Sequence, residues 1–148
     1  SNQQTFYMTN VTPQNQAFNE SGWLTLENKV RSWAFASDTL YVVSGCVVSD
    51  KSKTIRDNNG RSVPVPDAYY KVLLRYSKSS TFGFSGYSAA AFYLEHEHNR
   101  VTLTNEHMMS VDELEKKLGM DFFVNLPDDI ENKVEQQNPK NITWWSVN

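Results

Sequence analysis

The chain has 148 residues, of which 39% are hydrophobic, 21% charged and 13% aromatic. This composition indicates one globular domain over residues 1–148 and excludes a disordered chain, which has far fewer large apolar residues. The single cysteine, Cys46, excludes an internal disulfide framework and a cysteine-based zinc site. No apolar run approaches the length of about 18 residues that a membrane-crossing helix needs.

The charge is distributed unevenly along the chain. The net charge of −3 argues against a simple polycationic binder. Residues 1–86 carry 9 Lys and Arg against 6 Asp and Glu, whereas residues 87–148 carry 5 against 11. A polyanionic partner is therefore expected to prefer the first half.

The first third predicts a strand, a loop and a helix. Residues 5–9 form a short β-prone run, and residues 10–16 are polar and interrupted by proline, which favours a loop. Over residues 21–36 large apolar side chains recur at three- and four-residue spacing, as in an amphipathic helix. The apolar face expected to pack on the core consists of Trp23, Leu26, Val30 and Trp33. This register turns Glu27 and Arg31 toward a groove.

The middle of the chain predicts three strands. Residues 40–48 form a continuous apolar run, which is typical of a buried central strand, with Gly45 as a bulge or a point of close approach. Residues 57–60 mark a turn inside a loop that ends near residue 66. Residues 69–76 and 87–94 are the other two strands, joined by a flexible connection, and in the first of them Lys71 and Arg75 share a face.

The last third predicts helices. Ser110 begins a capping box before a helix that ends at Gly119, a natural helix stop. Pro127 is expected at the first position of a second helix that reaches residue 137, and Trp144 and Trp145 are expected to dock on the body. The predicted class is α+β, a mostly antiparallel sheet flanked by helices.

Three polar residues of the first third suggest phosphate chemistry. Asn19, Glu27 and Arg31 are eight and four residues apart, so they share a face if the helix extends back to Asn19. Two Cα atoms eight residues apart lie about 12 Å apart along such a helix, which suits a cation at Asn19 and a cation-bound water at Glu27. A hard cation with mostly water ligands suits Mg²⁺, and the guanidinium of Arg31 suits a phosphate. The alternative is an ordinary asparagine beside a Glu27–Arg31 surface pair.

A family resemblance covers nearly the whole chain. The run FYMTNVTPQ at residues 6–14, followed by Asn19, Gly22-Trp23, Leu26-Glu27 and Arg31, resembles the sugar-non-specific DNA/RNA endonucleases with a ββα-metal finger. Residues 65–72 (VPDAYYKV) and 110–123 resemble the strand and the C-terminal helical region of the same family.

The resemblance implies a metal-dependent nuclease that cleaves both DNA and RNA and leaves 5′-phosphate ends. It implies that Asn19 is the sole protein ligand of one Mg²⁺, that Glu27 orients a metal-bound water and that Arg31 contacts the phosphate. Asn10 and Gln14 would brace the loop beneath the site. Family members are usually exported, so an extracytoplasmic location is expected. The sequence leaves open whether the chain forms a homodimer.

One family motif is missing from these residues. The general base of the family is a histidine in an Asp-Arg-Gly-His motif, on the strand before the one that we expect at residues 5–9, and the 148 residues contain no such motif. We therefore expect residues 1–148 to be the C-terminal major part of the nuclease domain, without the first strand of the finger. The expected cause is removal of an upstream segment, and the chain alone is expected to be inactive.

The histidines and the cysteine do not replace that base. His96 and His98 allow a two-histidine metal site, but no neighbouring residue completes a ligand set, so a solvated loop is favoured. His107 is expected at the surface, and Cys46 is expected to be a small buried hydrophobic residue.

Two further functions remain open from the sequence. One is a non-catalytic module that binds nucleic acid or a protein and is derived from the nuclease fold. The other is a carbohydrate-binding domain, suggested only by the aromatic content. Aromatic side chains of the strands either stack on bases or belong to the core; they are Tyr69, Tyr70, Tyr76, Tyr87 and Phe92.

Overall fold

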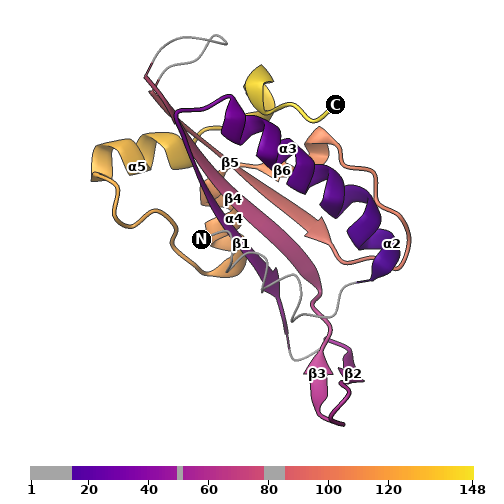
Figure 1. Cartoon of the computed structure of the whole chain (residues 1–148). Helices are drawn as coiled ribbons and strands as arrows, with labels where there is room; N and C mark the ends of the chain where they lie inside the picture. The colour runs from indigo at the N-terminus through magenta and orange to yellow at the C-terminus, as the bar shows by residue number, and fades with distance from the viewer. Residues whose placement is uncertain (1–14, 50–51, 79–85) are drawn as a thin grey trace.

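The computed structural model describes residues 15–49, 52–78 and 86–148. Its main element is a four-stranded antiparallel sheet with the strand order β1-β4-β5-β6. The strands are β1 (Thr39–Val47), β4 (Ala68–Ser77), β5 (Gly86–Glu95) and β6 (Met108–Met109). In Figure 1, helix α3 (Leu24–Phe35) lies along one face, while α4 (Val111–Leu118) and α5 (Asp128–Glu135) lie on the other. The predicted α+β class is confirmed.

Strand β4 is buried on both faces of the sheet. Tyr69 and Leu73 belong to the hydrophobic cluster beneath α3. Tyr70, Val72 and Leu74 belong to a second cluster with α4 and α5. Because neighbouring side chains of a strand point to opposite faces, this alternation places Lys71 and Arg75 on the α3 side, as the sequence predicted for their shared face.

The helical segment begins earlier than predicted. It opens with α2 (Gln16–Phe18), continues through a π turn over Asn19–Trp23 and then becomes α3. The side chain of Asn15 accepts hydrogen bonds from the backbone N–H groups of Ala17 and Phe18, at 3.0 and 3.4 Å, and Phe18 is fully buried. The predicted start near residue 21 is wrong, because the cap at Asn15 and the buried Phe18 lie in a run of mostly polar residues. The predicted end near residue 36 is confirmed.

The predicted apolar face of the helix is confirmed. Trp23, Leu26 and Trp33 are buried, and Val30 packs against the same cluster. The predicted strands at 40–48, 69–76 and 87–94 each agree with the structure within one residue at either end. The buried central position expected for the first is wrong, because β1 is the outer strand of the described sheet, with Tyr41 and Val43 exposed. Gly45 is a point of close approach, because an added Cβ would lie 2.3 Å from Tyr70 Oη. The unbroken register between β1 and β4 shows no bulge there.

A hairpin of β2 (Thr54–Arg56) and β3 (Ser62–Pro64) was not predicted. It extends from one end of the sheet, away from the helices (Figure 1). Its turn is the predicted one: the Gly60 N–H donates to the carbonyl of Asp57 at 3.0 Å, and Gly60 has a φ of +76°. The strands are three residues long and largely exposed, so they leave no apolar alternation in the sequence.

The helices of the last third agree with prediction in type. Ser110 Oγ accepts a hydrogen bond from the Glu113 N–H at 3.1 Å, and Gly119 ends α4 with a φ of +68°. Pro127 precedes α5 as its N-cap, one residue before its predicted position inside the helix. Trp145 is fully buried, and its Nε1 donates to Ser88 Oγ at 2.9 Å, which confirms the docking of the C-terminal tryptophans.

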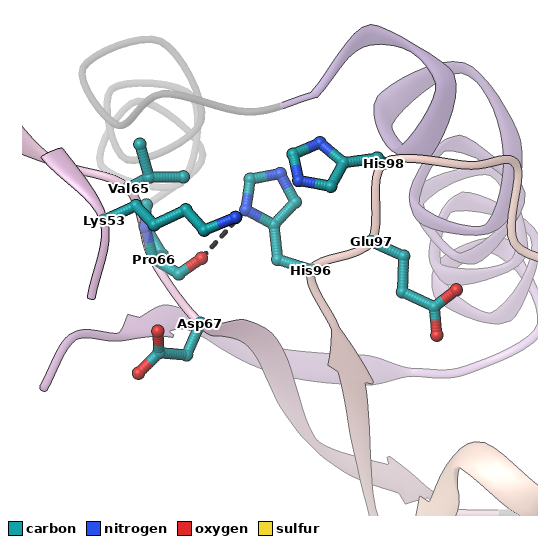
Figure 2. A pocket seen from close by; sticks show the side chains of 7 residues that line it. All are labelled: Lys53, Val65, Pro66, Asp67, His96, Glu97 and His98. Atoms are coloured by element: carbon teal, nitrogen blue, oxygen red, sulfur yellow. Dashed lines mark hydrogen bonds between the residues drawn. The ribbon is translucent and has the colours of Figure 1, made fainter. Parts of the chain in front are cut away.

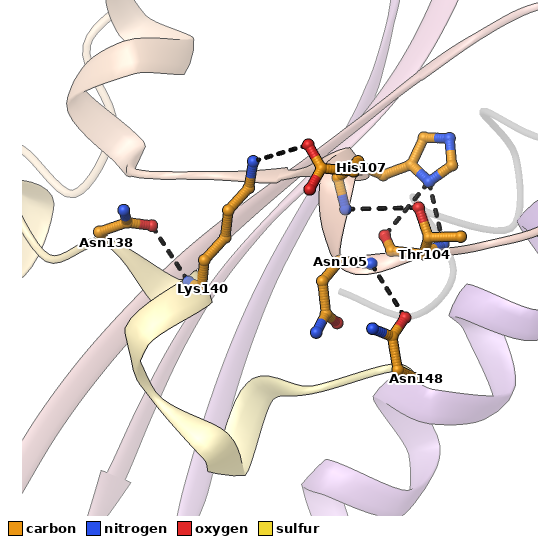
Figure 3. Close-up of polar contacts among 7 residues, drawn as sticks. Thr104, Asn105, His107, Asn138, Lys140 and Asn148 are labelled. Carbon is orange, nitrogen blue, oxygen red and sulfur yellow. Dashed lines mark hydrogen bonds and ion pairs between the residues drawn. The ribbon is translucent and has the colours of Figure 1, made fainter.

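Polar contacts fasten the C-terminal segment to the segment before β6 (Figure 3). The Asn105 N–H donates to Asn148 Oδ1 at 3.3 Å, and Lys140 Nζ contacts Glu106 Oε2 at 3.3 Å. Within the described ranges, no helix is long and apolar enough to span a bilayer.

Candidate functional site

The π turn positions Asn19. Its i→i+5 hydrogen bond runs from the Leu24 N–H to the carbonyl of Asn19, and Ser21 has non-helical angles of φ −120° and ψ −106°. Ser21 Oγ donates to the Ala17 carbonyl at 2.6 Å and accepts from the Val101 N–H at 2.9 Å. The second of these bonds joins the kink to the chain that follows β5.

The kink changes the angle between Asn19 and Glu27 around the helix. In a regular α-helix, side chains eight residues apart point about 80° away from each other. The non-helical angles of Ser21 interrupt this regular rotation, so Asn19 lies before the kink and Glu27 lies after it on α3.

Asn19, Glu27 and Arg31 lie on the solvent side of this helical segment. Asn19 and Arg31 are exposed, and Glu27 is half-buried. Among the described residues, neither the Asn19 amide nor the Glu27 carboxylate makes a side-chain hydrogen bond or an ion pair. Arg31 Nη1 donates a hydrogen bond to Asn28 Oδ1 at 2.6 Å. The Glu27–Arg31 surface pair is thus not formed, and two oxygen donors remain open to a ligand. Asn10 and Gln14, the expected supporting residues, lie outside the described residues.

Lys71 is a charged neighbour of this site that sequence reasoning missed. It is 2% exposed, its Nζ donates to Ser44 Oγ at 2.7 Å, and the same nitrogen lies 4.7 Å from the centroid of the Trp23 ring. Burial lowers the pKa of Lys71 to about 8, while the charge of Glu27 raises it and the charge of Arg31 lowers it further. The available signal was a lysine between the apolar residues Tyr69 and Leu73 on one face of a predicted strand.

His96 is a structural residue. Its Nδ1 lies 2.8 Å from the Pro66 carbonyl (Figure 2). Its Nε2 accepts the Asn15 N–H at 2.8 Å. The ring also makes edge contacts with Phe18 and Tyr69. The solvated-loop prediction is wrong for His96, because this ring ties the end of β5 to the start of α2. Both ring nitrogens are engaged, so His96 offers none to a metal ion.

The sequence also singles out His98, His107 and Cys46 as candidates. His98 is exposed at a shallow pocket of about 220 Å³, which Lys53, Asp67 and His96 also line (Figure 2). His107 is half-buried and not fully at the surface, because its Nδ1 accepts the Thr104 N–H at 3.1 Å. Cys46 packs against the cluster beneath α3, and burial raises the pKa of its thiol.

The strand aromatics are mainly core residues. Tyr69, Tyr70 and Phe92 are buried. Tyr76 and Tyr87 are half-buried, and their ring centroids lie 4.8 Å apart. An extended aromatic platform for bases or sugars is therefore not formed by these five side chains.

A comparison with protein families shows the family to which this chain belongs. The model of the DNA/RNA non-specific endonucleases matches residues 1–129. The chain belongs to this family. It is 27% identical over 128 residues to a nuclease of Serratia marcescens, a match that covers 84% of this chain and 46% of that protein. It is 29% identical over 140 residues to a nuclease of a Nostoc species, covering 92% of this chain and 49% of that protein. The chain thus spans about half the length of these relatives.

Proposed function

We propose that this member of the endonuclease family is the major part of a metal-dependent enzyme that hydrolyses phosphodiester bonds in DNA and RNA. The observation that carries the proposal is that Asn19 is exposed just before α3 and Glu27 is half-buried on α3, each with a side-chain oxygen that no described residue engages. Family membership supports the substrate class.

The donor set fits a magnesium ion. Asn19 offers an exposed amide oxygen, and Glu27, eight residues further along the chain, offers a half-buried carboxylate. Mg²⁺ prefers such oxygen ligands and keeps several waters, so one direct protein ligand is sufficient. When bound there, the ion would supply stabilisation of the negative charge on the departing oxygen.

The remaining side chains have separate roles in this proposal. Glu27 accepts hydrogen bonds from a water molecule and thereby orients it. Arg31 donates N–H groups to a phosphate oxygen, for which its exposed position on α3 is suitable. Lys71 of β4 lies near them, where burial lowers the pKa of its ammonium and the charge of Glu27 raises it. Asn10 and Gln14 support the loop that precedes Asn19.

The general base is proposed to come from outside residues 1–148. His96 has both ring nitrogens occupied by backbone groups, and His107 has its Nδ1 occupied. His98 is exposed, and no described group orients its ring. An upstream segment carrying the Asp-Arg-Gly-His motif would complete the site. We also propose that the enzyme acts outside the cytoplasm; fractionation of producing cells, with nuclease activity remaining in the cytosolic fraction, would contradict this.

The test is a plasmid-nicking assay with Mg²⁺ on the protein with its upstream segment restored. Asn19→Ala is expected to remove most metal-dependent cleavage. Glu27→Ala is expected to reduce the rate about 10- to 100-fold, as the loss of a residue that orients a metal-bound group usually does. Ser32→Ala is the control, because Ser32 is exposed on the same helix.

Two results would contradict the proposal. Equal and negligible effects of Asn19→Ala and Glu27→Ala would leave these residues as ordinary surface positions. Binding of DNA without any cleavage, in the protein with its upstream segment, would indicate the alternative of a non-catalytic binding module.

A further inference from the structure

Five carboxylates gather between α4, α5 and the segment that joins them. They are Asp112 and Glu115 of α4, Asp121 of the joining segment, and Glu131 and Glu135 of α5. They form two sets of three, Asp112, Glu115 and Glu135 in one and Asp121, Glu131 and Glu135 in the other, with ligand oxygens within 4.8 Å of one another in each set. Glu135 belongs to both sets and is therefore the centre of the cluster.

Glu135 has a buried oxygen that lacks a donor. The residue is 5% exposed, and among the described residues no group lies within hydrogen-bond distance of its Oε1. A buried carboxylate oxygen without a donor is costly in free energy, so native proteins almost always satisfy it. Glu135, which carries this orphaned oxygen, is common to both sets of closely spaced carboxylates, which indicates that a positively charged ligand belongs there.

No basic side chain of the described residues neutralises the cluster. The ion pairs among the described residues join Arg61 to Asp57 and Lys140 to Glu106, and neither involves the five carboxylates. The cluster is therefore a concentration of acidic oxygens that no ion pair of the described residues offsets.

We infer that a calcium ion binds at Glu135 and fastens α4 to α5. Ca²⁺ takes six to eight oxygen ligands in flexible geometry, which a group of carboxylates from three segments can supply. Mg²⁺ demands a near-ideal octahedron and dehydrates reluctantly, and softer metals prefer nitrogen or sulfur. Asp112 and Glu115 are three residues apart on α4, and Glu131 and Glu135 are four apart on α5, so each helix presents a pair on one face.

This calcium site is separate from the proposed nuclease site. The helices α4 and α5 pack on the sheet face of Tyr70 and Leu74, whereas α3 packs on the opposite face (Figure 1). Loss of one site is thus not expected to remove the other, and the inference does not depend on the proposed nuclease activity.

The test is calorimetric titration of the calcium-free full chain with CaCl₂ and, separately, with MgCl₂, together with thermal unfolding. The wild type is expected to bind one Ca²⁺ more tightly than Mg²⁺ and to unfold at a higher temperature when calcium is present. Glu135→Gln is expected to weaken calcium binding at least about 10-fold and to remove the thermal shift. Its calcium-free form is expected to unfold at the same or a higher temperature, because an amide removes the buried charge.

Matched controls separate this site from general charge effects. Glu113→Gln makes the same chemical change at an exposed position of α4, and Asn19→Ala alters the nuclease site; both are expected to keep the calcium response. Asp112→Asn and Glu131→Gln, each partly exposed, test the two sets if Glu135→Gln does not fold. Absence of calcium binding in the wild type, or equal losses in Glu135→Gln and Glu113→Gln, would overturn the inference. A calcium response abolished by Asn19→Ala would overturn it also.

Discussion

The ammonium of Lys71 lies 4.7 Å from the ring centroid of Trp23, so the central strand β4 contacts the last residue of the π turn. Trp23 is 1% exposed and holds the start of α3 on the sheet. Cation–π contacts of this kind are stronger when the cation is removed from water. This contact connects the buried face of the sheet to the helix that carries Glu27 and Arg31.

Replacing Lys71 is expected to affect catalysis more than folding. Lys71→Met keeps much of the side-chain volume and removes a buried charge, so the free energy of unfolding at neutral pH is expected to change little. Because the positive charge near Glu27 is lost, the nicking rate of the protein with its upstream segment is expected to fall about 10-fold. A shift of the pH profile of nicking would show that the charge acts on the site.

The control for this prediction is Lys78→Met, which removes an exposed lysine at the end of β4. Its nicking rate is expected to equal that of the wild type. A loss of stability in Lys71→Met that fully accounts for the loss of activity, with no change in the pH profile, would leave Lys71 with a packing role alone.

Gly45→Ala is expected to destabilise the sheet. A Cβ at this position would lie 2.3 Å from Tyr70 Oη and 2.4 Å from Tyr70 Cζ, so the ring must move. Overpacking of this kind typically costs about 1–3 kcal/mol. Urea unfolding measures the loss. In the Tyr70→Ala background the same substitution is expected to cost much less, and an equal cost in both backgrounds would contradict the steric explanation.

His96→Ala is expected to destabilise the chain by about 1–3 kcal/mol, because the Pro66 carbonyl and the Asn15 N–H both lose their partner. His98→Ala, two residues further on and exposed, is expected to leave stability unchanged. Thermal and urea unfolding of the two variants give the comparison. Equal stability of both variants would show that the two bonds of His96 contribute nothing.

The chain of residues 1–148 alone is expected to nick plasmid poorly. A positioned general base typically contributes about 10²- to 10⁴-fold to a rate, and none of the three histidines occupies such a position in this structure. The comparison is the same chain with its upstream segment restored, under equal Mg²⁺. Strong nicking by the short chain, abolished by His98→Ala, would place the base within these residues.

Long apolar periodicities were predictable from the sequence, and short polar elements were not. The strands β1, β4 and β5 and the end of α3 each follow nine or more residues of regular pattern. The hairpin of β2 and β3 has three exposed residues a strand, and β6 has two residues, so neither carries a pattern. The start of the helix was missed because the cap at Asn15 acts through a local hydrogen bond in a polar run.

The local geometry of the candidate site was not predictable from spacing alone. The spacing of Asn19, Glu27 and Arg31 predicted one continuous helix, whereas the kink at Ser21 is held by its contact with Val101, 80 residues away in the chain. The burial of Lys71 depends in the same way on β1 and α3 packing over it. Such long-range contacts leave no periodicity in a single sequence.

The calcium-free chain is expected to lose stability as the pH rises. Burial and acidic neighbours raise the folded-state pKa of Glu135 to about 8 and burial raises that of Glu115 to about 7, whereas an unfolded glutamate has a pKa of about 4.3. Between these values the folded chain binds more protons than the unfolded chain, so the free energy of unfolding is highest near pH 4–5 by this contribution and falls toward about pH 8. The groups that face Glu135 and Glu115 are Asp112, Asp121 and Glu131, and all of them are acidic.

Urea unfolding between about pH 5 and pH 8 with EDTA measures this fall, since linkage makes it a slope of stability against pH. Glu135→Gln is expected to flatten the slope, because the amide has no proton to lose, while Glu113→Gln retains it. Saturating Ca²⁺ is expected to cancel the slope by favouring the ionised carboxylates. Stability that rises with pH over the same interval in EDTA would show that the carboxylates around Glu135 are ionised without penalty and that the cluster needs neither protons nor calcium.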